Sequence, residues 1–452
     1  MTSKTENFYK TEKVAWDVSK PGYISKSGNI TLAGDTVINV ELLRDTDWIW
    51  TNIPSKIGAQ YLKFADGYKP NIATEFSTPL SVRKQPHKIS SIKLLNVWGK
   101  ADAPILFTEG LTKLEVYSDF LETFYLRTNV SRDPEDVSDW HAGYLEQIIL
   151  SHTPNLTTFS VGNSGRLREL YADDFSHVTS MAEAFYGNTS LEYISPMYLD
   201  SCTSLNSMFA YCKFSEFPTT LHNTSNVEST DSMFYNCKNL TSVPLFDTQN
   251  VTNMQGMFYN CMSLTSVPAF DTQNVTSMDG MFYYCTNLTS VPLFNTQNVT
   301  NMDSMFKGCY SLTTVPLFDT QNVTNMDGIF AYCKSLTTVP LFDTQNVTNM
   351  RDMFWRCNSL TSVPLFNTQN VTNMYQMFYN CTSLKNVGGF TGLKVDIEFI
   401  YSPLTHDSAL NVIDNLAVSS GHAITFKKTT FDTLTPEDIA KATSKGWKIQ
   451  SA

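Results

Sequence analysis

The feature that most constrains the fold is a set of cysteines that recur at a constant step of 24 residues. Phenylalanines keep the same step from Phe234 to Phe378, and leucines keep it from Leu240 to Leu384. A unit of this length cannot bury its apolar side alone, so successive units have to stack. The sequence therefore predicts a solenoid. The cysteines are Cys237, Cys261, Cys285, Cys309, Cys333, Cys357 and Cys381.

The first part of each unit has the spacing of a short strand. In the copy LTSVPAF, the candidates for burial are Leu264, Val267, Ala269 or its leucine equivalents, and Phe270. An apolar side in so short a segment is typical of a strand with one inward face. We expect these strands to stack at about 4.8 Å from coil to coil.

The second part of each unit has helical spacing. In NVTNMQGMFYNC the apolar residues are Val251, Met254, Met257, Phe258 and Cys261. They recur every three or four residues, which indicates a helix with one buried face. The predicted fold class is therefore an α/β solenoid, a leucine-rich-repeat-like array of 24-residue strand-turn-helix units.

The rhythm of the repeat sets the expected domain boundaries. The solenoid is expected at residues 95–399, with looser copies upstream of the regular 24-residue repeats at about 227–387. Among the upstream copies, YLEQIIL, NLTTFSV and LRELYA predict strands. Residues 1–94 carry alternating and β-branched residues between Gly, Ser and Asp, which favours an N-terminal β-rich, sandwich-like domain. Residues 400–452 are expected to form a small α/β C-terminal cap.

Helix-end signals are clear in the cap. Thr435 and Pro436 suit the start of a helix, and Gly446 suits its end. SALNVIDNL predicts an earlier helix, and HAITFKK predicts a strand between the two.

Charge and hydropathy exclude some partners. The net charge is −11, and no Lys/Arg-rich run could neutralise a row of phosphates, so we expect no nucleic-acid partner. No window approaches the roughly 18 apolar residues of a membrane span, so we expect no membrane insertion. The first twenty residues lack the apolar stretch and cleavage site of a secretory signal.

The repeated segment FDTQNVTNMDGMFYYCTNLTSVPLF resembles the BspA-like leucine-rich-repeat family, whose units carry the same F-D-T-x-N-V-T-x-M…M-F…C…S-L motif. The resemblance covers well over half of the chain. It implies a non-enzymatic surface adhesin of the bacterial kind, or a related array of bacteriophage tail and virion proteins. The ending DTLTPEDIAKATSKGWKI is similar to the cap of phage-borne and Bacteroidetes members, and GYISKSGNI is similar to accessory domains of phage tail proteins.

Two columns of the repeat could bind metal but are better explained by structure. Each unit supplies one Cys without a neighbouring His, whereas zinc needs four converging ligands, so we expect nine reduced packing thiols. Asp and Asn alternate at one turn position, which suits hydrogen bonds to turn backbone better than calcium. That column is Asp247, Asp271, Asn295, Asp319, Asp343 and Asn367.

Two further columns predict features of the local backbone. The Asn residues that begin each N-V-T triplet, such as Asn274, are expected to cap the predicted helices. The prolines at Pro244 and its equivalents cannot donate to a ladder, so hydrogen bonding should be interrupted once per coil.

The sequence offers no catalytic constellation. The seven histidines are scattered, and no phosphate loop or nucleophile motif is present. We therefore expect no enzymatic activity and no cofactor.

The columns around each Met and Cys vary from copy to copy, and aromatic residues gather in them near the C-terminal end of the array. Flat rings beside a guanidinium suit a glycan face or a protein anchor. The alternative is that these rings only cover the flank of the coils or pack on the cap. The candidate ligand-binding residues are Tyr332, Trp355, Arg356, Tyr375 and Tyr379.

The sequence favours the first of three functions and leaves the other two as alternatives. The first is a bacteriophage tail or virion protein that attaches to a host-surface glycan or protein and contacts other virion proteins through its N-terminal domain. The second is a bacterial cell-surface BspA-like adhesin. The third is a virion spacer without a ligand of its own. Homo-oligomerisation is compatible with all three.

Overall fold

The computed structural model describes residues 145–452 continuously and, before them, eight strands. The chain divides into two compact units: unit 1 is residues 1–214 and 218–226, and unit 2 is residues 215–217 and 227–452. The eight strands are β1 (Glu12–Val18), β2 (Lys26–Leu32), β3 (Asn39–Leu42), β4 (Tyr61–Phe64), β5 (Ser91–Leu95), β6 (Gly99–Ala101), β7 (Lys113–Tyr117) and β8 (Leu121–Tyr125).

Unit 1 is built on a parallel sheet of seven strands in the order β12-β11-β9-β7-β5-β4-β3. A second parallel sheet has the order β10-β8-β6, β13 pairs with β14, and β1 pairs with β2 antiparallel. Strands were predicted at YLEQIIL, NLTTFSV and LRELYA, and β9, β10 and β11 confirm them. The remaining elements of unit 1 are β9 (Gln147–Ser151), β10 (Thr158–Ser160), β11 (Glu169–Ala172), β12 (Tyr193–Ile194), β13 (Met197–Tyr198), β14 (Leu221–His222) and η2 (Thr224–Asn226).

The expected N-terminal domain at residues 1–94 overlaps this sheet. Strands β3, β4 and β5 pair in parallel with one another, and β5 pairs with β7. Most other residues of the range lie outside the described part of the chain. The sandwich and the boundaries at residues 94 and 399 therefore stay predictions.

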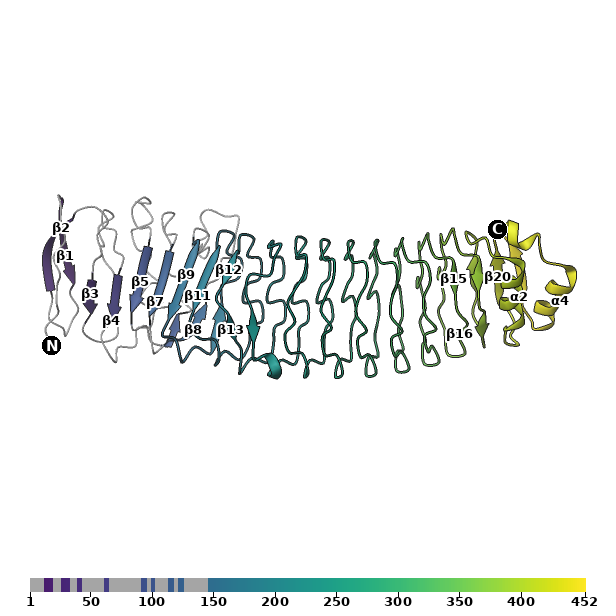
Figure 1. Cartoon of the computed structure of the whole chain (residues 1–452), viewed down its shortest axis with the longest axis horizontal. Helices are drawn as coiled ribbons and strands as arrows, with labels where there is room; N and C mark the ends of the chain where they lie inside the picture. The colour runs from purple at the N-terminus through teal and green to yellow at the C-terminus, as the bar shows by residue number, and fades with distance from the viewer. Residues whose placement is uncertain are drawn as a thin grey trace. The chain divides into compact units, whose positions relative to one another are not determined.

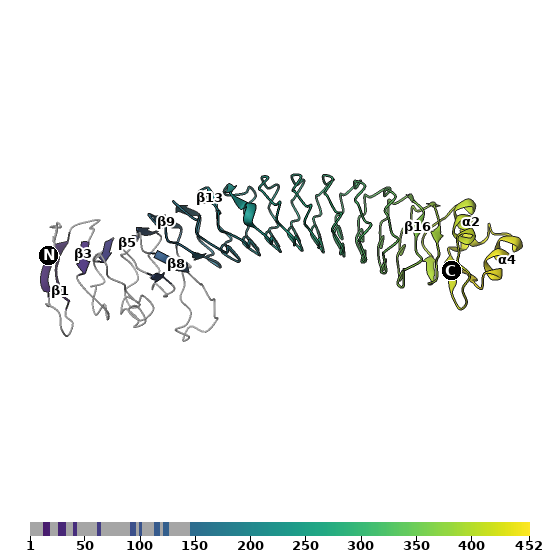
Figure 2. The same ribbon diagram turned by 90° about the horizontal axis from the view of Figure 1, so that it is seen from below.

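Unit 2 is a stack of coils that repeat every 24 residues, which confirms the predicted solenoid. Parallel bridges link equivalent residues of successive coils, as between Asn253 and Ser277 and between Ser277 and Asn301. The Phe, Cys and Leu columns point inward, and Phe258, Cys261 and Leu264 are fully buried. Figure 1 shows these coils side by side up to β15 and β16, and Figure 2 shows them turned by 90°.

The predicted helix of each unit is wrong. In unit 2 the segment from Met254 to Cys261, and its equivalent in each regular coil, is a run of tight turns that we call the turn segment. Met257 N donates to Met254 O (3.3 Å), and Cys261 N donates to Phe258 O (3.1 Å). The third residue of each of these turns, Gly256 or Asn260, has a positive φ of 56° or 61°, as a type II turn requires.

The same backbone N–H groups could bond within a helix or to the next coil, and in unit 2 they bond to the next coil. Gly256 N donates to Asp279 O of the next coil (2.8 Å), and Phe258 N donates to Met281 O (2.9 Å). These donors would serve a helix through bonds to the residue four places earlier. Stacked turns keep the three- and four-residue apolar spacing, so periodicity alone could not separate the two structures.

The extended segment, residues 264–270 and their equivalents, differs from expectation in two ways. The predicted strand is wrong for most regular coils, because paired strands occur in this segment only from Ser362 onward, with one earlier bridge from Thr338 to Ser362. One position also points the other way. Val243 and Phe246 point inward, but the leucines expected inside at the position of Ala269 point outward. The two inward residues are three places apart, with Pro and Leu between them, so strict alternation fails. The exposed leucines are Leu245, Leu293, Leu317, Leu341 and Leu365.

Proline interrupts the ladder at Pro364, as predicted. Strands on either side of Pro364 pair with the next coil, β15 with β17 and β16 with β18. The residues opposite Pro364 and Leu365 are Gly388 and Gly389, and a Cβ on Gly388 would clash with the backbone of Leu365. The strands are β15 (Ser362–Val363), β16 (Phe366–Asn367), β17 (Asn386–Val387) and β18 (Phe390–Thr391).

The Asp/Asn column has the predicted structural role. The side chain of Asp247 accepts a hydrogen bond from Gln249 N (3.0 Å), and Asn295 accepts one from Gln297 N (3.2 Å). The Asn column was wrongly expected to cap helices, because no helix follows it. Instead, the Asn274 amide donates to Gln249 O of the preceding coil (2.7 Å).

The cysteines pack inside the coils. All nine lie in the described part of the chain, all are buried, and none forms a disulfide. Cys261 Sγ donates to Phe234 O of the preceding coil (3.0 Å), and Cys285 Sγ donates to Phe258 O (3.1 Å). Burial raises the pKa of the Cys261 thiol well above its ordinary value, so the group stays protonated.

The C-terminal end of unit 2 contains the predicted helices and strand. Thr435 caps α4 in a capping box with Asp438, and Pro436 is its first residue. Gly446 has a φ of 87°, and a Cβ there would clash with Ser419 O. The elements are β19 (Ile397–Phe399), α2 (His406–Asp414), β20 (Ala423–Phe426), α3 (Lys428–Phe431), α4 (Pro436–Ser444) and β21 (Lys448–Ser451). Among the described helices, none has the length and apolar character to cross a bilayer.

Candidate functional site

Turn segments of unit 2 expose two columns of side chains that differ from coil to coil. One column is the residue before the first positive-φ residue of each turn segment, and it changes from Gln255 to Asp279 to Arg351. By contrast, the neighbouring inward position is Phe in all seven regular copies from Phe234 to Phe378. Packing fixes the inward column and leaves the outward columns free to vary, so these columns are where a ligand can be recognised.

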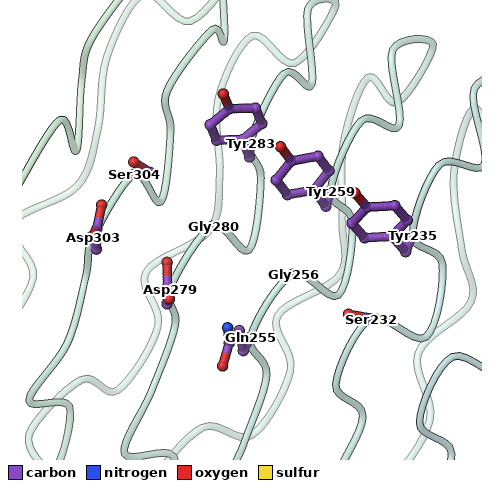
Figure 3. A pocket seen from close by; sticks show the side chains of 10 residues that line it. All are labelled: Ser232, Tyr235, Gln255, Gly256, Tyr259, Asp279, Gly280, Tyr283, Asp303 and Ser304. Carbon is purple, nitrogen blue, oxygen red and sulfur yellow. The ribbon is translucent and has the colours of Figure 1, made fainter.

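Three tyrosines form a row along the turn segments of consecutive coils (Figure 3). The rings of Tyr235 and Tyr259 stack at 4.6 Å with an angle of 12°, and those of Tyr259 and Tyr283 at 4.3 Å with an angle of 5°. Because each ring covers the face of the next, the row presents ring edges and hydroxyls to solvent. Burial and the neighbouring Tyr283 raise the pKa of Tyr259 above its ordinary value.

A hollow of about 330 Å³ lies beside this row. Gly256 and Gly280 lie between the tyrosines and the opposite wall, where Gln255, Asp279 and Asp303 stand (Figure 3). Ser232 and Ser304 complete the lining, one at either end. In later coils Asp352 and Gln376 occupy the glycine position, and their side chains would fill this space.

Negative charge concentrates in the hollow. Asp279 is half-buried, and its pKa is raised by burial first and then by the carboxylates of Asp303 and Asp231. No described residue donates a hydrogen bond to the Asp279 carboxylate. The hollow therefore offers carboxylate, amide and hydroxyl acceptors to a ligand that brings hydroxyl or amino donors.

The structure brings together four of the five residues selected from the sequence. The rings of Tyr332 and Trp355 meet edge to face at 4.6 Å, and those of Trp355 and Tyr379 lie 6.4 Å apart. The Arg356 guanidinium lies 5.5 Å from the Tyr332 ring and 5.4 Å from the Trp355 ring. Tyr375 is 59% exposed, and its hydroxyl accepts a hydrogen bond from Gln376 (3.3 Å) instead.

The rings of this C-terminal cluster pack partly against other residues of the chain. The Tyr379 ring meets Tyr401, just before α2, at 4.9 Å. The Trp355 indole nitrogen is buried and has no hydrogen-bond partner. Part of the surface of these rings therefore faces protein.

Sequence reasoning missed the hollow as a unit. It noted that the columns of Gln255 and Tyr259 vary, but it placed the site where Trp and Arg occur. The available signal was a run of three tyrosines at a step of 24 beside glycines in the left-handed position. Within the described residues, no group of three or more His, Cys, Asp or Glu side chains could hold a metal ion.

Inward columns of Leu, Phe and Cys, with variable outward columns on stacked coils, define a solenoid protein of the leucine-rich-repeat type. The chain belongs to the family described as "Mycoplasma protein of unknown function, DUF285", whose model matches residues 157–266, 238–338 and 311–395. The matched residues make up more than half of the chain. No curated protein matches the sequence.

Two solved structures are similar to the chain at low identity. A leucine-rich repeat protein from Eubacterium ventriosum is 13% identical, with 69% of this chain and 83% of that chain covered and a TM-score of 0.35. A leucine-rich cell surface protein from Faecalibacterium prausnitzii is 14% identical, with 84% and 95% covered and a TM-score of 0.31. These likenesses do not extend to function, and the solenoid fold rests on the chain's own coil-to-coil hydrogen bonds.

Proposed function

We propose that this protein is a non-enzymatic adhesin of a bacterial cell surface, and that it binds its partner through the outward columns of the turn segments in unit 2. The observation that carries the proposal is the open hollow beside Tyr259, lined by side chains that the coil itself does not need. A rigid stack that varies only in its outward residues is suited to recognition.

The cell-surface reading is preferred to the virion reading that the sequence favoured. The family to which the chain belongs is described from Mycoplasma, a cellular bacterium. Nothing in that description supports a phage tail. The array retains the binding role expected of it in either setting.

A glycan with neutral or amino-bearing sugars is the ligand class that the hollow favours. Asp279 and Asp303 accept hydrogen bonds from hydroxyl or ammonium groups and repel carboxylated or sulfated sugars. The stacked tyrosines add hydroxyls and ring edges along the same groove. The cluster of Tyr332, Trp355 and Arg356 is a second proposed contact.

A glycan array probed with the full chain tests this function. We expect binding to neutral or amino-bearing glycans and none to acidic ones. The double variant Asp279→Ala and Asp303→Ala should weaken binding about tenfold or more, because hydrogen bonds to charged groups are among the strongest. Asp414→Ala with Asp432→Ala makes the same charge change on exposed residues of the cap and should leave binding unchanged.

A second variant assigns the contact. If Trp355→Ala with Arg356→Ala abolishes binding while the melting temperature is preserved, the C-terminal cluster takes part as well. A chain that binds no glycan, or whose binding survives both double variants, refutes the proposed function.

A further inference from the structure

One side of unit 2 carries a regular stripe of exposed apolar side chains. Leu245, Leu293, Leu317 and Leu341 are 63%, 65%, 59% and 63% exposed, and Leu365 is 41% exposed. Ala269 takes the same place in the second coil. Isolated exposed leucines are ordinary, but a row of them in register over six consecutive coils is an apolar patch that calls for a partner.

The residues that precede the stripe in each coil are uncharged. In each of these six coils, Pro stands one place before the Leu or Ala. Ser or Thr stands three places before it, and Thr stands four places before it. None of the resulting 24 positions is charged, and none is buried. We call these positions the threonine-leucine face. The nearest charges are the exposed Asp247, Asp271, Asp319 and Asp343, which lie two residues after the Leu or Ala and border the face along one edge.

Threonine hydroxyls on this face are partly used inside the stack. Thr241 Oγ1 donates to Ser215 O (3.0 Å), Thr265 Oγ1 to Thr241 O (3.3 Å) and Thr361 Oγ1 to Thr337 O (3.1 Å). Because these donors are already satisfied by the preceding coil, the face can lose water without leaving them unpaired. At these threonines the face is therefore less polar than its composition suggests.

We propose that the threonine-leucine face pairs with the same face of a second copy of this chain. Two copies have identical spacing between coils, so rows of Leu and Pro from one copy can fit between rows of the other along the whole patch. A contact between identical patches is the usual form of a two-fold dimer. The 24 positions on each side match the roughly 20–30 residues per partner of a specific interface.

Electrostatics favours a second copy at this face over the turn segments. Two copies that each carry a net charge of −11 repel one another wherever acidic residues meet. The turn segments carry Asp231, Asp279, Asp303 and Asp327, so a contact there would bring like charges together. Within the 24 positions of the threonine-leucine face that cost is absent, and acidic residues border the face only at the Asp247 column. The pairing is independent of the proposed glycan binding, which uses the turn segments.

Analytical ultracentrifugation of the full chain over a range of concentrations tests the pairing. We expect a reversible dimer whose dissociation constant in 500 mM NaCl is equal to or lower than that in 50 mM NaCl, because an apolar contact is not weakened by screening. Leu293→Glu with Leu317→Glu places like charges at the centre of the face and should raise the dimer dissociation constant at least about tenfold. Because both side chains are exposed, the melting temperature of the monomer should be preserved.

Gln273→Glu with Gln297→Glu is the matched control. It adds the same charge at exposed turn positions away from the face and should leave the dimer nearly unchanged. A chain that stays monomeric at every concentration, or a dimer that survives the leucine substitutions, overturns the proposal. Loss of glycan binding without loss of the dimer would refute only the proposed function.

Discussion

The Asp279 carboxyl lines the hollow, and its negative charge there is unfavourable for folding. Burial raises its pKa, and the carboxylates of Asp303 and Asp231 add to the shift. For an acid whose pKa is raised by folding, the stability contribution is fully present below the ordinary value of about 3.8 and is lost as the pH rises through the folded value. At neutral pH this ionised group therefore works against folding, which is typical of a residue retained for binding.

Asp279→Asn should therefore make the protein more stable at neutral pH. We expect a melting temperature raised by roughly 1–2 °C at pH 7, with the difference from the parent chain disappearing below about pH 4. Thermal melts of both proteins from pH 3.5 to 7 measure it. Asp271→Asn is the control, since Asn already fills that column at Asn295 and Asn367. A gain that grows on acidification would contradict this linkage.

At the scale of elements, the sequence predicted which residues point inward better than it predicted the backbone. Phe258 and Cys261 were placed inside correctly, because stacked turns and helices share the same apolar spacing. The signal for turns was present in Gly256 and Asn260, residue types that adopt a positive φ more readily than others. The hollow could not be predicted, because its shape depends on how the side chains of Tyr235, Tyr259 and Tyr283 stack.

Loss of a residue from the phenylalanine column should lower the stability of unit 2 more than other substitutions. Phe306 is fully buried, and its ring stacks 5.6 Å from Phe282 and 5.8 Å from Phe330. Phe306→Ala should cost roughly 3–5 kcal/mol because it leaves a large cavity. Hydrogen exchange should show loosening confined to this coil and its neighbours, whereas the exposed Lys334→Ala should change little. Uniform loosening throughout unit 2 would contradict the nearest-neighbour picture.

For the molecule as a whole, the repeat length was the reliable guide, because 24 residues fix the return of the chain to the same place in the next coil. Family membership agrees with it, since the family model matches three overlapping stretches of the array. The sequence could not settle where the array begins. Its upstream copies keep the apolar positions and lose the turn motif that marks each coil.

Deleting residues 313–336 removes one complete coil and joins Leu312 to Thr337 in register. We expect the product to fold, with circular dichroism per residue unchanged and a modest loss of stability, because each coil contacts its neighbours alone. Deleting residues 313–324 removes half a coil, so the inward columns no longer align, and that product should aggregate or unfold. Equal behaviour of the two products would show that coil register does not determine this fold.

The buried thiols have a consequence for how the protein is made. In the folded chain all nine cysteines are buried, and burial raises the pKa of the six thiols from Cys261 to Cys381, so an oxidant has little to attack. During synthesis the same nine thiols are accessible, and a disulfide between two of them would tie coils together before they reach their proper stacking. Vulnerability to oxidation is therefore confined to the interval between translation and completion of the stack. If the chain is exported, the timing of its folding relative to its arrival in an oxidising environment determines the yield of active protein.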